Sequence, residues 1–250
     1  MDKNKDRFPF DIEIAYSKEL NKFIDSIEKK FKEIFLGKKN SEDLIDFDDE
    51  ELKKEFLEYY EELLTTDYAF DMCSDYILDV LEYTIALINS EAKEIVGISF
   101  IEQAFYDEKV IQELLEKSIS LIKSEPTKYL RTYDSQLQKL ISEKIEQGQT
   151  LSDLSKAIQA TTGIERNRAN LIAADQVGNV FAETSKIQFK GIGLKKFIWE
   201  TSRDARVRKS HAEREGKIYE WDNPPDGEIP GRPIRCRCSA GIVKEELLNL

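Results

Sequence analysis

The side chains best suited to bind a metal or transfer a proton lie together in the C-terminal part of the chain. The 250-residue sequence has three cysteines and one histidine. Cys236 and Cys238 form the sequence CRC, and His211 precedes them in the segment WETSRDARVRKSHAEREGKIYEW. On an extended backbone, residues two apart point to the same side, so both thiols can reach one partner. A disulfide between them would be strained, because their Cα atoms would lie about 6.5–7 Å apart, at the limit of disulfide geometry.

Two thiolates and an imidazole are ligands that zinc prefers, and a structural zinc ion takes four ligands. His211, Cys236 and Cys238 therefore predict a zinc site, with Asp204 as the nearest candidate for the fourth ligand. The alternative is that both thiols are buried as small apolar side chains and bind no metal. The sequence leaves both interpretations open.

The segment TSRDARVRKSH is interpreted as a helix that begins at Thr201 or Asp204, since either side chain can cap a helix. Asp204, Arg208 and His211 would then share one face of that helix. In the alternative interpretation, Asp204 forms an ion pair with Arg208 or Arg235 and takes no part in metal binding.

Catalysis has no clear set of residues in this chain. There is one histidine, and no Ser/His/Asp or Cys/His/Asn group occurs at a recognisable spacing. The sequence also lacks a Walker loop and a dinucleotide-binding fingerprint. We therefore expect that the protein is not an enzyme.

Residues 1–149 predict a helical, bundle-like domain. Apolar residues recur every three or four positions from Tyr16 to Phe35, which indicates one helix that follows Pro9 and ends at Gly37. Further helices are predicted near residues 52–64, 67–89, 91–105, 107–123 and 127–147, with breaks at Asn89-Ser90, Tyr106-Asp107 and Pro126.

Residues 150–250 predict a small α+β domain with a short β-sheet. A short helix, a turn at Thr161-Thr162-Gly163 and a long helix over residues 164–189 come first. Aromatic and β-branched residues predict strands in KKFIWETS, GKIYEWD and IRCRCSAGIV. The loop NPPDGEIPGRP carries four of the six prolines, which leaves it little conformational freedom. The fold class is therefore α+β, a predominantly helical N-terminal domain followed by this smaller one.

The net charge of −12 argues against a general polyanion binder. The charge is uneven, however, with 16 Lys+Arg against 13 Asp+Glu in residues 160–250 and 21 against 36 in residues 1–159. We predict weak, sequence-independent DNA contact by the C-terminal part. No apolar run is long enough to cross a bilayer, so we expect no membrane partner. The residues predicted to contact DNA are Lys195, Lys196, Arg203, Arg206 and Lys209.

The C-terminal motifs resemble one family when taken together. A tryptophan leads T-S-x-D-x-R-V-R-x-x-H, and a glycine, a Pro-Gly pair and CRC-x-A follow. This pattern resembles the C-terminal domain of the phage Mu F-like minor head proteins, also called phage head morphogenesis proteins, over residues 150–250. Ala174 and the sequence EREG depart from the family pattern. The matching residues are Trp199, Thr201, Asp204, Arg206, Val207, Arg208, His211, Gly216, Pro230, Gly231, Cys236, Arg237, Cys238 and Ala240.

The resemblance implies a low-copy minor capsid protein of a tailed double-stranded DNA phage or prophage. Such a protein is expected in the capsid interior at the portal vertex, and in the host cytoplasm during assembly. Its expected partners are the portal protein and the major capsid or scaffolding protein, with packaged DNA nearby. The resemblance also implies that the rare residues cluster because a domain with a small core needs a staple.

The alternative function is a metal-dependent enzyme or toxin-like effector that is delivered with the phage genome. The number of metal ligands separates the two functions. A closed site with four protein ligands is structural, whereas three protein ligands and a water leave a reactive position.

Overall fold

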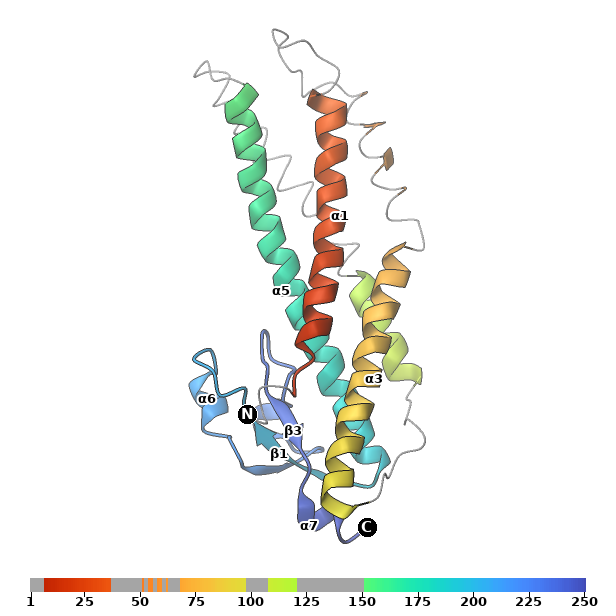
Figure 1. The fold of residues 1–250 in the computed structure, drawn as a ribbon, viewed down its shortest axis with the longest axis vertical. Coiled ribbons are helices and arrows are strands. Elements are labelled where there is room, and N and C mark those ends of the chain that lie inside the picture. The colour runs from red at the N-terminus through yellow and green to blue at the C-terminus, as the bar shows by residue number, and fades with distance from the viewer. Residues whose placement is uncertain are drawn as a thin grey trace. The chain divides into compact units, whose positions relative to one another are not determined.

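The computed structural model describes residues 7–36, 68–97, 108–120 and 151–250, together with isolated helical positions between residues 51 and 62. These residues form long helices and a small three-stranded antiparallel sheet towards the C-terminus (Figure 1). The predicted α+β class, with helices first and a short sheet after them, is confirmed.

Helix α1, Phe10–Leu36, matches the first predicted helix. It begins directly after Pro9, whose carbonyl accepts a hydrogen bond from the N–H of Glu13. Its buried residues include Tyr16, which stacks on Tyr76 with ring centroids 4.0 Å apart. The apolar stripe that predicted this helix therefore serves as its packing face.

Helix α3, Tyr68–Val96, is one continuous helix, so the predicted break at Asn89-Ser90 is wrong. Asn and Ser cost only a fraction of a kcal/mol in a helix, and neither blocks the helical backbone. Ile88 and Ala92 are both buried on either side of them, and this burial outweighs the cost. Gly97, with a φ of 76°, follows the last helical residue.

Residues 108–120 are helical, within the helix predicted over residues 107–123. The predicted helix over residues 127–147 lies outside the described residues. The same holds for residues 98–105 and for most of the predicted helix over residues 52–64.

Helix α5, Leu151–Gly191, is also continuous, so the predicted turn at Thr161-Thr162-Gly163 is wrong. Thr and Gly lower helix propensity by up to about 1 kcal/mol each, but neither breaks a helix as proline does. The helix ends near the predicted residue. Gly193 there has a φ of 91°, and the N–H of Leu194 bonds to the carbonyl of Phe189 at 2.9 Å.

Strand β1, Lys196–Glu200, is the centre of the sheet. It pairs antiparallel with β2, Ile218–Glu220, and with β3, Ser239–Gly241. The third strand is much shorter than the predicted IRCRCSAGIV, because Arg235 has a φ of 56° and interrupts any extended run. The sequence CRC therefore lies outside the sheet.

The helix predicted from Thr201 or Asp204 is wrong, because the described helix here is only α6, Lys209–Ala212. The carboxylate of Asp204 accepts a hydrogen bond from the N–H of Arg206 at 2.8 Å, which holds the chain in a turn. Two further short elements complete this part of the fold, the 3-10 helix η1, Pro225–Gly227, and helix α7, Lys244–Leu247.

The core around the sheet combines residues from distant parts of the sequence. Helix α3 contributes Ile88 and Ala92, and α5 contributes Ala182 and Phe189. The sheet and the loops after it supply the rest: Phe197, Trp199, Trp221, Ile229, Cys236, Cys238, Ala240, Ile242 and Leu247, with Leu194 before the sheet.

Partly buried charges also join the N-terminal segment to the sheet. The guanidinium of Arg7 donates to Glu91 of α3 at 2.7 Å and to the carbonyl of Ala240 at 2.8 Å. It forms an ion pair with Glu200 at 2.9 Å. The other oxygen of Glu91 accepts a hydrogen bond from the N–H of Ile242 at 3.0 Å. Arg7 is therefore linked to the sheet region both directly and through Glu91.

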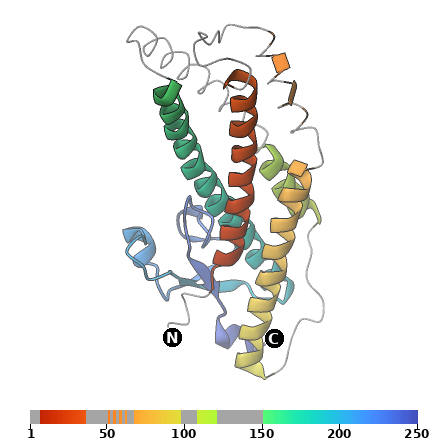
Figure 2. The ribbon, with the colours of Figure 1, turned by 45° about the horizontal axis from the view of Figure 1, so that its top comes forward.

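The compact unit that contains the sheet consists of Met1–Tyr16, Ser74–Glu116 and Leu171–Leu250 (Figure 2). It therefore takes segments from both sides of the predicted boundary between residues 149 and 150. The second unit consists of Ser17–Cys73 and Lys117–Asn170. In that unit, the amide of Asn170 on α5 accepts a hydrogen bond from Asn21 on α1 at 2.9 Å.

The loop that leads to the cysteines packs on α5 through two glycines. A Cβ on Gly178 would lie 2.9 Å from the carbonyl oxygen of Gly231, and one on Gly231 would lie 3.2 Å from that of Gly178. Gly231 also has a φ of 90°, which side chains rarely adopt. The absence of a side chain at Gly178 therefore permits this close packing on α5.

We predict that Gly231→Ala destabilises the protein by about 2–4 kcal/mol, because it adds a steric clash to backbone strain. Chemical denaturation monitored by circular dichroism measures this change. Gly227→Ala is the matched control, since Gly227 has a φ of 71° but nothing within 4 Å of its Cβ position. Equal losses in both variants would show that the contact with α5 contributes nothing.

Candidate functional site

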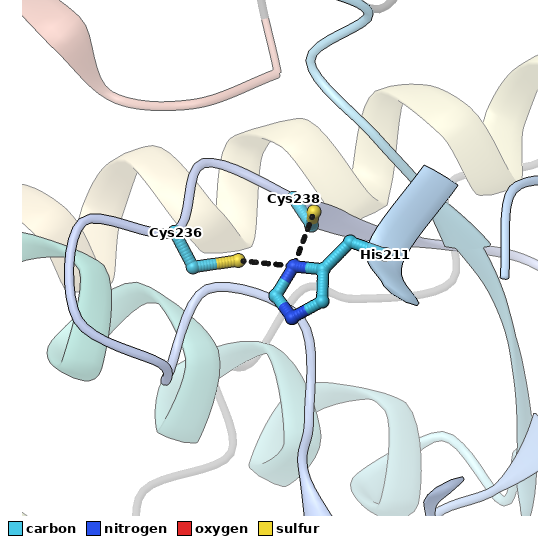
Figure 3. Close-up of side chains that lie close together, drawn as sticks. All are labelled: His211, Cys236 and Cys238. Carbon is cyan, nitrogen blue, oxygen red and sulfur yellow. Dashed lines mark hydrogen bonds between the residues drawn. The ribbon is translucent and has the colours of Figure 1, made fainter. Parts of the chain in front are cut away.

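Three of the predicted ligands converge in the structure (Figure 3). The Nδ1 atom of His211 lies 3.5 Å from the Sγ atom of Cys236 and 3.5 Å from that of Cys238. All three ligand atoms lie within 4.8 Å of one another. The side chains are buried, with 2%, 4% and 2% of their surfaces exposed. We call this group the His/Cys cluster.

Helix α6 and strand β1 position the histidine. α6 is a single turn, closed by a hydrogen bond from the N–H of Ala212 to the carbonyl of Arg208. The imidazole of His211 packs edge-on against the fully buried ring of Trp199, with centroids 5.1 Å apart. The guanidinium of Arg214 covers the same tryptophan at 4.8 Å. The ring of His211 is thus fixed by packing, because Trp199 is itself in the centre of the sheet.

A tight turn positions the cysteines. The N–H of Cys236 donates to the carbonyl of Pro233 at 2.7 Å, and that of Arg235 donates to Asp175 on α5 at 3.2 Å. β3 begins directly after Cys238. The two thiols face the same partner, as predicted, although the backbone that carries them is not a strand.

The second ring nitrogen of His211 faces a carboxylate. Its Nε2 atom lies 3.5 Å from Glu228 in the proline-rich loop. The same carboxylate accepts a hydrogen bond from Arg214 at 2.7 Å, and Arg214 also donates to Asp226 at 2.6 Å. Sequence reasoning missed Glu228 and Arg214, and the only available signal was the presence of two acids within a loop of prolines and glycines.

The two thiols perturb each other. A hydrogen bond with Cys238, and then one with His211, lowers the pKa of Cys236, although burial opposes this. The hydrogen bond to Cys236 and burial raise the pKa of Cys238. The two thiols therefore titrate as a pair, and the first proton leaves that pair next to an imidazole.

Asp204 is not one of the converging ligands. It lines the same small pocket, about 20 Å³ in volume, as the cluster. Its carboxylate, however, is bound by the guanidinium of Arg206 at 2.7 Å, which lowers its pKa. The predicted pairing with Arg208 or Arg235 is also wrong, because Arg206 takes that place and Arg208 donates to the carbonyl of Ile234.

Other residues of the predicted family motif support the cluster from outside. The N–H of Thr201 donates to Glu215 at 2.6 Å, and the N–H of Gly216 donates to the carbonyl of Trp199 at 2.8 Å. Arg237, between the cysteines, donates to Glu13 of α1 at 2.8 Å. This last pair spans 224 sequence positions, so no local pattern could predict it. Pro230 and Gly231 are buried where the loop meets α5.

The basic residues predicted to contact DNA differ in their surroundings. Lys195, Lys196 and Lys209 are exposed. Arg203 forms an ion pair with Glu215 at 2.8 Å, and Arg206 with Asp204 at 2.7 Å. Among the described residues, no helix is long and apolar enough to cross a membrane.

Comparison with known proteins bears directly on this region. Residues 135–241 match the family model described as phage Mu protein F like protein. This region is therefore similar to the phage Mu F-like family. The match includes His211, Cys236 and Cys238. The resemblance inferred from the C-terminal motifs is thereby confirmed for residues 135–241, and it suggests a phage head morphogenesis protein.

The chain is also 30% identical over 186 residues to an uncharacterized protein of Haemophilus influenzae. The alignment covers 73% of this chain and 41% of that protein, so the chain spans well under half of the relative's length. No solved structure is detectably similar to the chain.

The support around Thr201 predicts an acid-sensitive contribution to stability. Burial raises the pKa of Glu215, but hydrogen bonds from Thr201 and Arg203 outweigh it, so the pKa lies below its ordinary value. A lowered pKa in the folded state stabilises the fold above the ordinary pKa, and this contribution disappears as the pH falls through the folded value.

We therefore predict that Glu215→Gln lowers the free energy of unfolding by about 1–2 kcal/mol at pH 7 and by much less below about pH 4. Urea unfolding at both pH values measures the difference. Glu213→Gln, at an exposed neighbouring position, is the control and should change stability little at either pH. A loss in Glu215→Gln that is the same at both pH values would contradict the assignment.

Proposed function

We propose that this protein is a minor head morphogenesis protein of a tailed double-stranded DNA phage or prophage and acts at the portal vertex during head assembly. The match of residues 135–241 to the phage Mu F-like family carries this proposal. Under it, the protein is made in the host cytoplasm and becomes part of the virion, in the capsid interior. Its partners are the portal protein and the major capsid or scaffolding protein.

The dimensions of the site favour a structural role over an enzymatic one. The pocket beside the His/Cys cluster has a volume of about 20 Å³, enough for a water molecule. Pockets that bind small-molecule substrates are typically on the order of 300–1,000 Å³. A metal-dependent enzyme or delivered effector would need a larger opening next to these residues, so we propose that the cluster acts as a staple.

Helix α3 offers a surface for the portal protein. Asp75, Asp79 and Glu82 are exposed and follow one another at helical spacing, and we call them the α3 acidic stripe. Partial burial and then the charges of Asp75 and Glu82 raise the pKa of Asp79. This mutual repulsion would be relieved by a basic partner surface, which favours the acidic helical half as the portal-binding part.

The test is a triple variant of the stripe, Asp75→Lys, Asp79→Lys and Glu82→Lys. We predict that it co-sediments with cognate portal rings about tenfold or more weakly, because the charge of the contact surface is reversed. The experiment uses the full chain, since removal of residues 1–149 would take Ile88 and Ala92 out of the core.

The matched control changes three exposed acids of the C-terminal part by the same charge, Glu213→Lys, Glu220→Lys and Glu245→Lys. It should leave portal binding nearly unchanged. If the control weakens binding as much as the stripe variant does, the portal contact is not on α3.

The same proposal places packaged DNA near the exposed lysines of the C-terminal part. We predict that a triple variant, Lys195→Ala, Lys196→Ala and Lys209→Ala, binds duplex DNA more weakly. Its binding should also depend less on salt, with the slope of log K against log salt reduced by about one for each lysine that contacts phosphate. Fluorescence anisotropy at several salt concentrations measures both. Lys18→Ala, Lys93→Ala and Lys244→Ala form the control, and an equal reduction there would show that the contact is not local to the predicted residues.

A further inference from the structure

We propose that His211, Cys236 and Cys238 bind one zinc ion through Nδ1 and the two Sγ atoms, and that a water molecule in the adjoining pocket completes the tetrahedron. This proposal does not depend on the proposed function, since it rests on the geometry of the three side chains and their surroundings. It assigns to these residues a metal, a coordination number and a water in the fourth position. Three protein ligands and a water alone would indicate a reactive site, but the pocket of about 20 Å³ leaves no room for a typical substrate, so the zinc would still act as a structural staple.

The distances from the imidazole nitrogen to the two sulfurs fit the edges of a tetrahedron around zinc. With Zn–S bonds of about 2.3 Å and Zn–N bonds of about 2.0–2.1 Å, a nitrogen and a sulfur on the same zinc lie about 3.5 Å apart. The two observed separations from Nδ1 of His211 are 3.5 Å and 3.5 Å. Both nitrogen–sulfur separations are therefore those of two ligands on one zinc ion, and the three ligand atoms lie within 4.8 Å of one another.

The hydrogen-bonding capacity of the ring supports the same conclusion. Nδ1 of an imidazole either donates one proton or accepts with one lone pair, so it forms one good hydrogen bond in the ring plane. Here it faces Cys236 and Cys238 at equal distances (Figure 3). One hydrogen bond cannot serve two sulfurs equally well, whereas a metal ion placed between them can be bound by all three atoms.

A carboxylate lies near the other ring nitrogen of the histidine, as it does around many metal-binding histidines. Histidines that bind a metal usually donate their other ring nitrogen to a carboxylate, which fixes the tautomer with the ligand nitrogen free of its proton. Nε2 of His211 lies 3.5 Å from Glu228, and Arg214 holds that carboxylate in place at 2.7 Å. The proline-rich loop thus supplies the outer carboxylate, while the segment after it supplies both thiols.

The fourth position faces the pocket. Asp204 also lines this pocket, but Arg206 binds both of its oxygens through the main chain and the guanidinium, at 2.8 and 2.7 Å. A volume of about 20 Å³ accommodates one water molecule. A neutral water next to two thiolates also avoids adding a third negative charge to the zinc, which a carboxylate would bring.

The alternative is that the two thiols are small buried side chains, and the test separates it from the zinc site. The full-length chain, purified without chelator and then equilibrated with zinc chloride and dialysed, should contain one zinc per chain by elemental analysis. Removal of zinc with EDTA should lower the melting temperature, because the metal stabilises only the folded state. Less than about 0.1 zinc per chain, together with an unchanged melting curve, would overturn the proposal.

Substitutions localise the metal. Cys236→Ser and His211→Gln should each reduce the zinc content severalfold, whereas Cys73→Ser should retain it. Cys73 is the matched control, since it is a buried cysteine on α3 that does not belong to the His/Cys cluster. If a ligand variant fails to fold, cobalt replacement in the unaltered chain gives the answer, because two thiolates produce an intense near-ultraviolet charge-transfer band. The absence of that band would overturn the ligand assignment.

The open position has its own test. Azide added to the cobalt form should change the visible bands, since it displaces the water, and Asp204→Asn should leave the bands unchanged. A spectrum that is insensitive to azide and is altered by Asp204→Asn would overturn the open position and make Asp204 the fourth ligand.

Discussion

The close approach of the backbone at Gly231 to helix α5 at Gly178 sets the position of the segment that carries both cysteines. No side chain larger than hydrogen fits at either residue without displacing a carbonyl, so the loop can lie directly on the helix. From that point the chain has only five residues to reach Cys236, and Asp175 on the same helix anchors the intervening turn at Arg235. Helix α5 therefore determines where the two thiols lie.

The histidine reaches the same point by an independent route. β1 is paired on both sides, and its Trp199 packs against the ring of His211 while the strand itself is fixed by β2 and β3. Because β3 begins just after Cys238, the strand that positions the imidazole also holds the far end of the CRC segment. Helix α5 thus positions the two cysteines and β1 positions the histidine. A metal ion or hydrogen bonds among these three side chains connect α6 to the segment between the proline-rich loop and the sheet.

The sequence predicted these elements where their causes were local. The apolar stripe of α1 and the β-branched and aromatic residues of β1 and β2 are such causes, and these elements are present. The breaks predicted in α3 and α5 failed because weak helix formers were treated as stops, although buried neighbours such as Ile88 carry the helix through them. Asp204 was misplaced for a similar reason: its side chain satisfies its own turn at Arg206, which a helical interpretation does not consider. The convergence of His211 with both cysteines was predictable from residue type. The contact of Glu228 with His211 was not, because Glu228 lies in an irregular loop, and the contact of Glu13 with Arg237 was not, because the two residues are remote in sequence.

The region that matches the phage Mu F-like family does not contain all of its own core in this chain. Ile88 and Ala92 of α3 lie in the same buried cluster as Trp199 and Cys238, and Arg7 binds Glu91 of α3, Ala240 of β3 and Glu200 of β1. Arg237, placed between the two thiols, is held by Glu13 of α1. Partly buried ion pairs therefore connect the first turns of α1 and the second half of α3 to the segment that carries the cysteines. The position of the CRC segment thus depends both on the His/Cys cluster and on the N-terminal residues that bind next to it.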